Sequence, residues 1–182
     1  MDIYSVFKFV HVLTAIAWVG GGLTLLAHSI IASRASGDME QLKTLDIMNV
    51  LGKTWFVPIS LLTVVTGAVT TTLGGLWLEP WVIIGLMGFA STFFTGLLLL
   101  EPVGRRIGEN LHAGQIDSGL SAGKDLLRIA KFDYTVMLVV IADMVFKPQL
   151  ADLWMIAIFA AVIAAGAVAF LMNGKLPQRA TA

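Results

Sequence analysis

The chain contains no cysteine. It can therefore form neither disulfides nor thiolate metal or iron–sulfur sites, and only histidine, methionine, carboxylate and main-chain groups remain as metal ligands. Charged residues are also scarce, at 13% of the sequence, compared with about a quarter in soluble domains. The net charge is zero. Because nucleic-acid binding requires a basic surplus, we expect no nucleic-acid partner.

Apolar residues make up 57% of the sequence and are gathered into long runs. A helix of about 20 residues crosses a bilayer. Five runs approach or exceed that length, at about 4–32, 54–74, 80–100, 131–147 and 151–173. Backbone polar groups in lipid must be hydrogen-bonded within the segment, and the runs lack the alternation of barrel strands, so all should be helices. The first run is too long for a cleaved signal peptide and is expected to remain.

The sequence therefore predicts an all-α, polytopic membrane helix bundle, with five transmembrane helices in a single transmembrane domain over 1–182. Lysine and arginine in short loops set orientation. Ten of these residues fall on one side: Arg34, Lys43, Lys53, Arg105, Arg106, Lys124, Arg128, Lys131, Lys175 and Arg179. Only Lys8 and Lys147 fall on the other.

This asymmetry predicts an outside amino terminus and a cytoplasmic carboxyl terminus. The connection at about 101–130 is then cytoplasmic. Its segment KDLLRIAKF, residues 124–132, is amphipathic enough for a helix that lies in the membrane interface.

The first span contains a histidine and a lysine. His11 lies about 10 Å along the helix from Tyr4, at 1.5 Å per residue, and so falls inside the hydrocarbon. Steps of three, four and seven residues share one helix face. That face carries Tyr4, Lys8, His11, Ala15, Trp18 and Gly22. Ionisable groups in a span are costly against lipid, so this face should meet protein or water.

The fourth predicted span carries a second polar set at a similar, outer-leaflet depth. Asp143 and Lys147 are four residues apart and can pair along one face. Met137 and Met144 are seven apart and could offer thioether ligands to copper or haem. The alternatives are snorkelling for the lysines and ordinary packing for the methionines.

Two roles remain open for His11: a ligand or proton-handling group, or a hydrogen-bonded structural group. His28 lies about 25 Å further along the same helix, and His112 falls in the cytoplasmic connection. Neither can complete a site with His11. In the second span, Thr63, Thr66, Gly67 and Thr70 form a stripe suited to close helix packing.

The pattern Lys8-x-x-His11-x6-Trp18-x-Gly20-Gly21 resembles the first helix of a superfamily of small bacterial membrane proteins. It includes HemJ-type protoporphyrinogen oxidases, the CopD copper-resistance domain and an uncharacterised family of predicted integral membrane proteins. The MVFKP ending at 144–148 is most similar to that uncharacterised family. The resemblance implies a four-helix core plus one further helix, in a bacterial cytoplasmic (inner) membrane. The resemblance implies that His11 matches a haem-binding histidine, although the third span, 80–100, has no counterpart of that superfamily's other histidine.

The leading functional hypothesis is an outer-leaflet site that binds haem b through His11 and serves electron transfer. Trp18 and Gly22 would shape the porphyrin slot, and Lys8 or Lys147 would pair with a propionate. Copper is the alternative cofactor, with His11, Met137 and Met144 as ligands.

Two further hypotheses belong to other classes. In a transport protein, His11 and Asp143 would relay protons or coordinate a cation. In an accessory subunit, the small-residue faces would pack within a homo-oligomer or a larger membrane complex. The sequence leaves open whether the protein is an enzyme.

Overall fold

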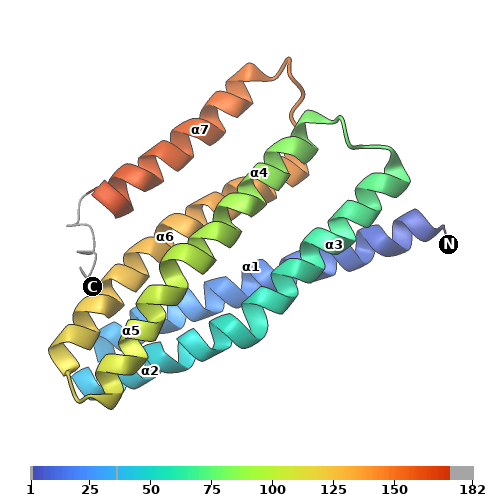
Figure 1. Ribbon diagram of the computed structural model, residues 1–182. Coiled ribbons are helices and arrows are strands. Elements are labelled where there is room, and N and C mark those ends of the chain that lie inside the picture. The colour runs from blue at the N-terminus through green and yellow to red at the C-terminus, as the bar shows by residue number, and fades with distance from the viewer. Residues whose placement is uncertain (1, 36, 173–182) are drawn as a thin grey trace.

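The computed structural model describes residues 2–35 and 37–172, which form helices and no strand. These residues make five rods that run back and forth (Figure 1). The rods are α1 (Ile3–Ala35); α2 (Asp38–Leu51), η1 (Gly52–Phe56) and α3 (Val57–Gly74); α4 (Pro80–Thr95), η2 (Gly96–Leu100) and α5 (Glu101–His112); α6 (Ile116–Phe146); and α7 (Leu153–Ala167) with η3 (Val168–Met172). Lys175 and Arg179, used to predict orientation, lie outside the described residues.

Four helices in the described part of the chain are long and apolar enough to cross a membrane. They are Ile3–Ile31, Asp38–Gly74, Pro80–His112 and Leu153–Met172. An all-helical membrane architecture is therefore confirmed. The apolar part of α6 contains Lys131, Asp133 and Asp143, so the predicted span at 131–147 is not among the four, and its crossing stays a prediction.

Two π-helical turns, η1 and η2, each precede a proline without breaking the rod. Pro58 and Pro102 occupy the first turns of α3 and α5. A proline lacks an N–H group and its ring crowds the carbonyl four residues earlier, which belongs here to Thr54 or Leu98, inside the π turn. The wider π turn accommodates both effects. The second and third rods consequently continue past the predicted span limits at 54 and 100.

The extended ends of these rods form a small helical bundle with the first half of α6. Its buried cluster is Leu42, Leu45 and Ile107. Leu42 and Leu45 occupy the space that side chains at Gly119 and Gly123 would fill, since a Cβ there would lie 2.6 and 2.5 Å from their Cδ1 atoms. The connection at 101–130 is thus α5 and the start of α6.

The segment expected to form an interfacial helix, 124–132, is part of α6 instead. Leu126 packs against the buried cluster of α2 and α5. The amphipathic pattern of this segment reflects, at least on that face, packing between helices.

At the opposite end of the molecule, the helices separate into two groups (Figure 1). α1 packs along α3, and α6 packs along α4 and α7. On α7, Gly166 lies against Thr135 of α6, where an added Cβ would be 2.9 Å from Thr135 Cγ2. α7 therefore flanks the other four rods.

Candidate functional site

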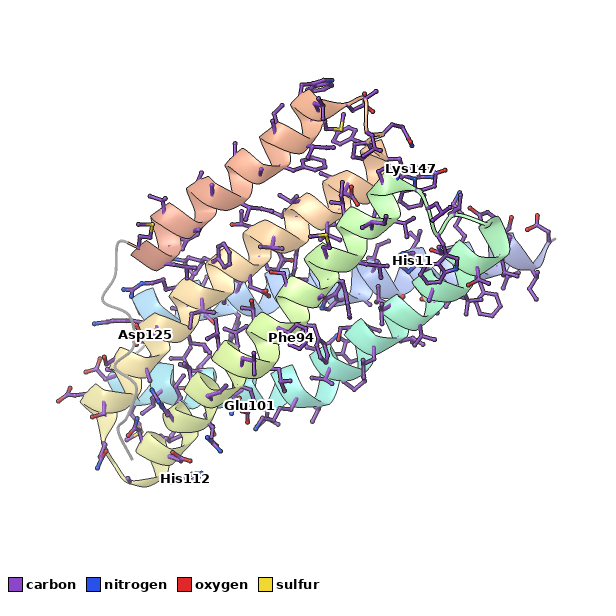
Figure 2. All side chains as sticks on the ribbon, turned by 45° about the horizontal axis from the view of Figure 1, so that its top comes forward. His11, Phe94, Glu101, His112, Asp125 and Lys147 are labelled. Atoms are coloured by element: carbon purple, nitrogen blue, oxygen red, sulfur yellow. The ribbon has the colours of Figure 1, made fainter. Side chains whose placement is uncertain are left out.

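His11 lies in the interface between α1 and α3 (Figure 2). Its Nδ1 is 2.9 Å from the main-chain oxygen of Thr63. A carbonyl oxygen only accepts hydrogen bonds, so Nδ1 donates, and a neutral ring then keeps its lone pair on Nε2. The polar neighbour explains how an imidazole is accommodated within the span.

The absence of a side chain at Gly67 makes room for the ring. A Cβ at Gly67 would lie 2.8 Å from His11 Cε1. One turn further along α1, the buried Thr14 donates from Oγ1 to the His11 carbonyl and lies 3.5 Å from Thr66 Oγ1. The predicted threonine and glycine stripe of the second span therefore faces His11 and its neighbours.

The later residues of the predicted α1 stripe face α6. Trp18 is buried in a cluster with Tyr134 and Met137. Gly22 lies against Tyr134, since an added Cβ would be 2.9 Å from Tyr134 Cε2, and the Tyr134 hydroxyl donates to the carbonyl of Val19. The stripe is thus divided: His11 contacts α3, whereas Trp18 and Gly22 face α6.

Asp143 is fully buried, and neither of its carboxylate oxygens has a hydrogen-bond partner. It lies against α4, where a Cβ added at Gly85 would be 3.2 Å from Asp143 Oδ2 and 2.0 Å from Met144 Cε. Met144 therefore packs against α4, whereas Met137 packs against Trp18. These contacts do not bring the two methionines together.

The structure does not form the Asp143–Lys147 ion pair that their spacing allows. Lys147 ends α6 with a left-handed φ of 50°, and its Nζ lies 5.0 Å from the centroid of the Trp81 ring. Lys8 is exposed, with its Nζ 5.9 Å from the centroid of the Tyr4 ring. Both ammonium groups are therefore placed over aromatic rings.

A cavity of about 290 Å³ lies among α1, η1, η2 and α6. Its walls are mostly apolar and include Trp18, Gly22, Phe56, Tyr134 and Met137. The polar residues of the wall are Ser29, Asn49, Lys53, Ser60, Thr92, Glu101 and Asp133. Both π turns contribute wall residues, as local π-helix often does at functional sites. Trp18, Gly22 and Met137, assigned from sequence to the outer site, belong to this cavity.

Asp133 is the candidate residue that the sequence prediction omitted. Its Oδ1 is buried without a hydrogen-bond partner, and the residue lines the cavity. Asp133 and Asp143 are the described residues whose buried side-chain oxygens lack a hydrogen-bond partner. The available signal was an ionisable residue within the predicted span at 131–147.

At the end of the cavity near α2 and α5, an ion pair connects two rods. Lys53 Nζ in η1 lies 2.9 Å from Glu101 Oε1 in α5, and both side chains are partly exposed. This pair joins the two π-containing rods beside the cavity.

Among the described residues, no group of three or more histidine, aspartate or glutamate side chains is arranged to hold a metal ion. His28 and His112 are exposed. His11 has the tautomer of an imidazole ligand, whose N–H is oriented by a carbonyl, but the residues predicted to share its site contact other parts of the bundle.

Comparison with known proteins gives one family. The model described as "Predicted integral membrane protein (DUF2269)" matches residues 5–148. No curated protein and no solved structure matches the chain.

Proposed function

The chain belongs to the DUF2269 family of predicted integral membrane proteins, and from this premise we propose that it crosses the bacterial inner membrane five times and moves protons or a small cation along α6. α6 would be the fifth span. It packs between α4 and α7, both parts of candidate membrane helices, and a helix packed along spanning neighbours lies at their depth. The excess of lysine and arginine on one side supports an outside amino terminus.

The observation that carries the transport proposal is a pair of carboxyl groups on α6 whose buried oxygens lack a hydrogen-bond partner. These are both oxygens of the fully buried Asp143 and Oδ1 of the partly buried Asp133. Asp133 and Asp143 are ten residues apart, which is about 15 Å along a helix. Asp133 lies at the cavity in the half nearer α2 and α5, and Asp143 lies nearer the other end. Carboxylates inside a span mark proton and ion pathways in many pumps and transporters.

Burial of a carboxylate without a partner is costly, and a bound proton or cation offsets that cost. The protein has unpartnered buried carboxyl oxygens at two positions, as expected if these groups take up and release a positive ion. The proposal retains Asp143 as the relay residue expected from the sequence and adds Asp133 as a second relay residue.

The cavity supplies a route from the end of the bundle to Asp133. The partly exposed Lys53–Glu101 pair and Asp133 line the same cavity, together with the polar side chains of Ser29, Asn49, Ser60 and Thr92. Beyond Asp133, the path toward Asp143 is packed. Met137 is buried, and Val140 fills the space at Gly88, where an added Cβ would be 2.3 Å from Val140 Cγ2. We propose that this packed stretch separates the two carboxyl groups until the helices shift.

Flux in liposomes tests the proposal. Purified protein is reconstituted, and uptake of protons, sodium or potassium is followed with the wild-type chain and with Asp133→Asn and Asp143→Asn. Asp117→Asn is the matched control, because Asp117 is an exposed aspartate on the same helix. We expect flux in the wild type and control and loss in both other variants. Absence of flux in the folded wild type contradicts the proposal.

Haem b at His11, with electron transfer, is a second candidate function. The Nδ1–H bond to the Thr63 carbonyl favours it, because such a bond orients a histidine whose Nε2 serves as a ligand. Bound haem would supply one-electron redox chemistry, and His11 would hold its iron. This candidate agrees with the resemblance of the first span to HemJ- and CopD-type proteins. Copper shared by His11, Met137 and Met144 gains no support, since the two methionines pack against different helices.

The optical spectrum of protein purified from haem-replete cells tests this second candidate. We expect a Soret band that is lost in His11→Ala and retained in His28→Ala, the control at an exposed histidine of the same helix. Colourless wild-type protein contradicts it. The result is independent of the flux measurement.

A further inference from the structure

The cavity among α1, η1, η2 and α6 contains a carboxyl group that no other wall residue neutralises. The ionisable residues of its wall are Lys53, Glu101, Asp133 and Tyr134. Lys53 and Glu101 pair with each other at 2.9 Å, and the Tyr134 hydroxyl donates to the Val19 carbonyl. Asp133 forms no ion pair with any residue that the structure describes. When Asp133 is ionised, the described wall therefore carries one uncompensated negative charge.

Two hydroxyl groups of the wall already donate within their own helices. The buried Ser60 donates to the Val57 carbonyl, and the buried Thr92 donates to the Phe89 carbonyl. Oδ1 of Asp133 is buried and has no hydrogen-bond partner. A carboxylate oxygen left in this way is costly, and a cationic donor gives it the stronger, charge-assisted kind of hydrogen bond. The cavity therefore favours a ligand that carries such a donor.

The rest of the cavity is suited to an apolar, aromatic body. Its aromatic wall residues are Trp18, Phe56, Phe93 and Tyr134. Such rings pack against another ring and attract a cation placed over their faces. The volume of about 290 Å³ lies at the small end of ligand sites, which begin at about 300 Å³.

A bound metal ion fits these walls less well. Calcium and magnesium take about six or more oxygen ligands. Nowhere in the described part of the chain are three acidic or histidine side chains arranged to hold a metal ion. An organic cation needs only one carboxylate partner, because its apolar part is stabilised by the apolar walls.

We propose that this cavity binds a small amphipathic ammonium compound, whose ammonium group donates to Asp133 and whose apolar body packs against the aromatic wall. The positive charge of the ligand complements the carboxyl group that the wall leaves unpaired. An uncharged compound of the same shape fills the apolar part but leaves Asp133 unneutralised. The proposal does not rest on ion transport, because it requires only the cavity and its carboxyl group.

Thermal unfolding of the full chain in detergent at neutral pH, followed by circular dichroism, tests the proposal. The probe is 2-phenylethylamine, which is an ammonium ion at this pH, and 2-phenylethanol is its uncharged match. A compound that binds the folded chain raises the melting temperature with its concentration, which gives an apparent Kd. The test variant is Asp133→Asn. The control is Asp117→Asn, at an exposed aspartate of the same helix.

We expect the wild type and Asp117→Asn to bind the ammonium compound about tenfold more tightly than the alcohol, because the bond to Asp133 is charge-assisted. Asp133→Asn should bind the two compounds equally. Equal affinity of the wild type for both compounds, or no binding of the ammonium compound, overturns the proposal. Undiminished ammonium binding by folded Asp133→Asn also overturns it.

The comparison of the two compounds uses the wild-type chain alone, so it is decisive even if Asp133→Asn does not fold. The outcome is also separate from that of the flux measurement. Ammonium binding without ion flux contradicts transport and supports the ligand site, whereas ion flux without ammonium binding contradicts the ligand site alone.

Discussion

Two carboxyl groups and one imidazole account for most of the chemistry that this chain keeps inside its bundle. The imidazole is paired, through Nδ1 and the Thr63 carbonyl. The carboxyl oxygens of Asp143 and the Oδ1 of Asp133 are not. A buried carboxylate without a partner lowers the stability of the fold. Replacement of Asp133 or Asp143 by a neutral residue should therefore maintain or raise stability and abolish ion flux.

Asp143→Asn tests that opposition in a single variant. An amide is cheaper to bury than a carboxylate, so we expect a melting temperature in detergent equal to or above that of the wild type, together with loss of ion flux. Asp117→Asn, at an exposed position, should leave both quantities unchanged. A clear fall in melting temperature for Asp143→Asn would show that the carboxylate is a structural contact.

Gly67→Ala tests how the His11 ring packs against α3. The added Cβ would lie 2.8 Å from the ring, so the ring or α3 must move, and such overpacking costs about 1–3 kcal/mol. Gly20→Ala is the matched control on the partner helix, because an added Cβ there would have no side chain of another residue and no atom of another helix within 4 Å, apart from its chain neighbours. We expect a lower free energy of unfolding for Gly67→Ala and no loss for Gly20→Ala. The reverse order would show that His11 does not occupy this gap.

At the scale of helices, the sequence predicts which segments are helical but not how far each one continues. The apolar runs correspond to α1, the end of η1 with α3, α4 with η2, the second half of α6, and α7 with η3. In the sequence, Pro58 indicates the start of a helix and Pro102 the end of one, yet the π turn before each proline lets the rod continue. A proline pattern alone does not distinguish a helix end from a π turn, so α2 and α5 could not be joined to their rods from sequence.

Candidate residues divide in the same way. An ionisable residue within an apolar run is visible in sequence, and His11 and Asp143 were found by that signal. Which neighbour each residue meets depends on helix rotation and crossing, which the face pattern does not determine. This explains why Trp18 and Met137 prove to line a cavity beside Asp133.

Leu42→Ala tests the bundle formed by α2, α5 and α6. Leu42 is fully buried and fills the space at Gly119. Truncation of a buried leucine costs about 2–5 kcal/mol, so we expect a clear loss of stability in denaturant unfolding. Leu153→Ala, at a leucine that is 69% exposed, is the control for the same truncation. Equal stability of the two variants would argue against a packed bundle at this end.

At the scale of the whole molecule, the five rods predict a membrane topology. Single introduced cysteines can test it, because the chain has no cysteine of its own. Single cysteines placed at Ala151 and His112, both exposed, occupy opposite ends of the bundle. In intact cells, a membrane-impermeant maleimide should label Ala151→Cys and not His112→Cys. Both should react after lysis. Labelling of His112→Cys alone in intact cells would reverse the proposed orientation, and equal labelling would contradict a spanning α6.

Transport requires that both ends of α6 exchange ions with water, although a packed stretch lies between its two carboxyl groups. The decisive measurement is proton flux into liposomes under a potassium diffusion potential, read with an enclosed pH-sensitive dye. The wild-type chain and Asp117→Asn should acidify the interior, and Asp133→Asn and Asp143→Asn should each remain at the rate of protein-free liposomes. Undiminished acidification in both of these variants would show that ions do not pass by way of α6.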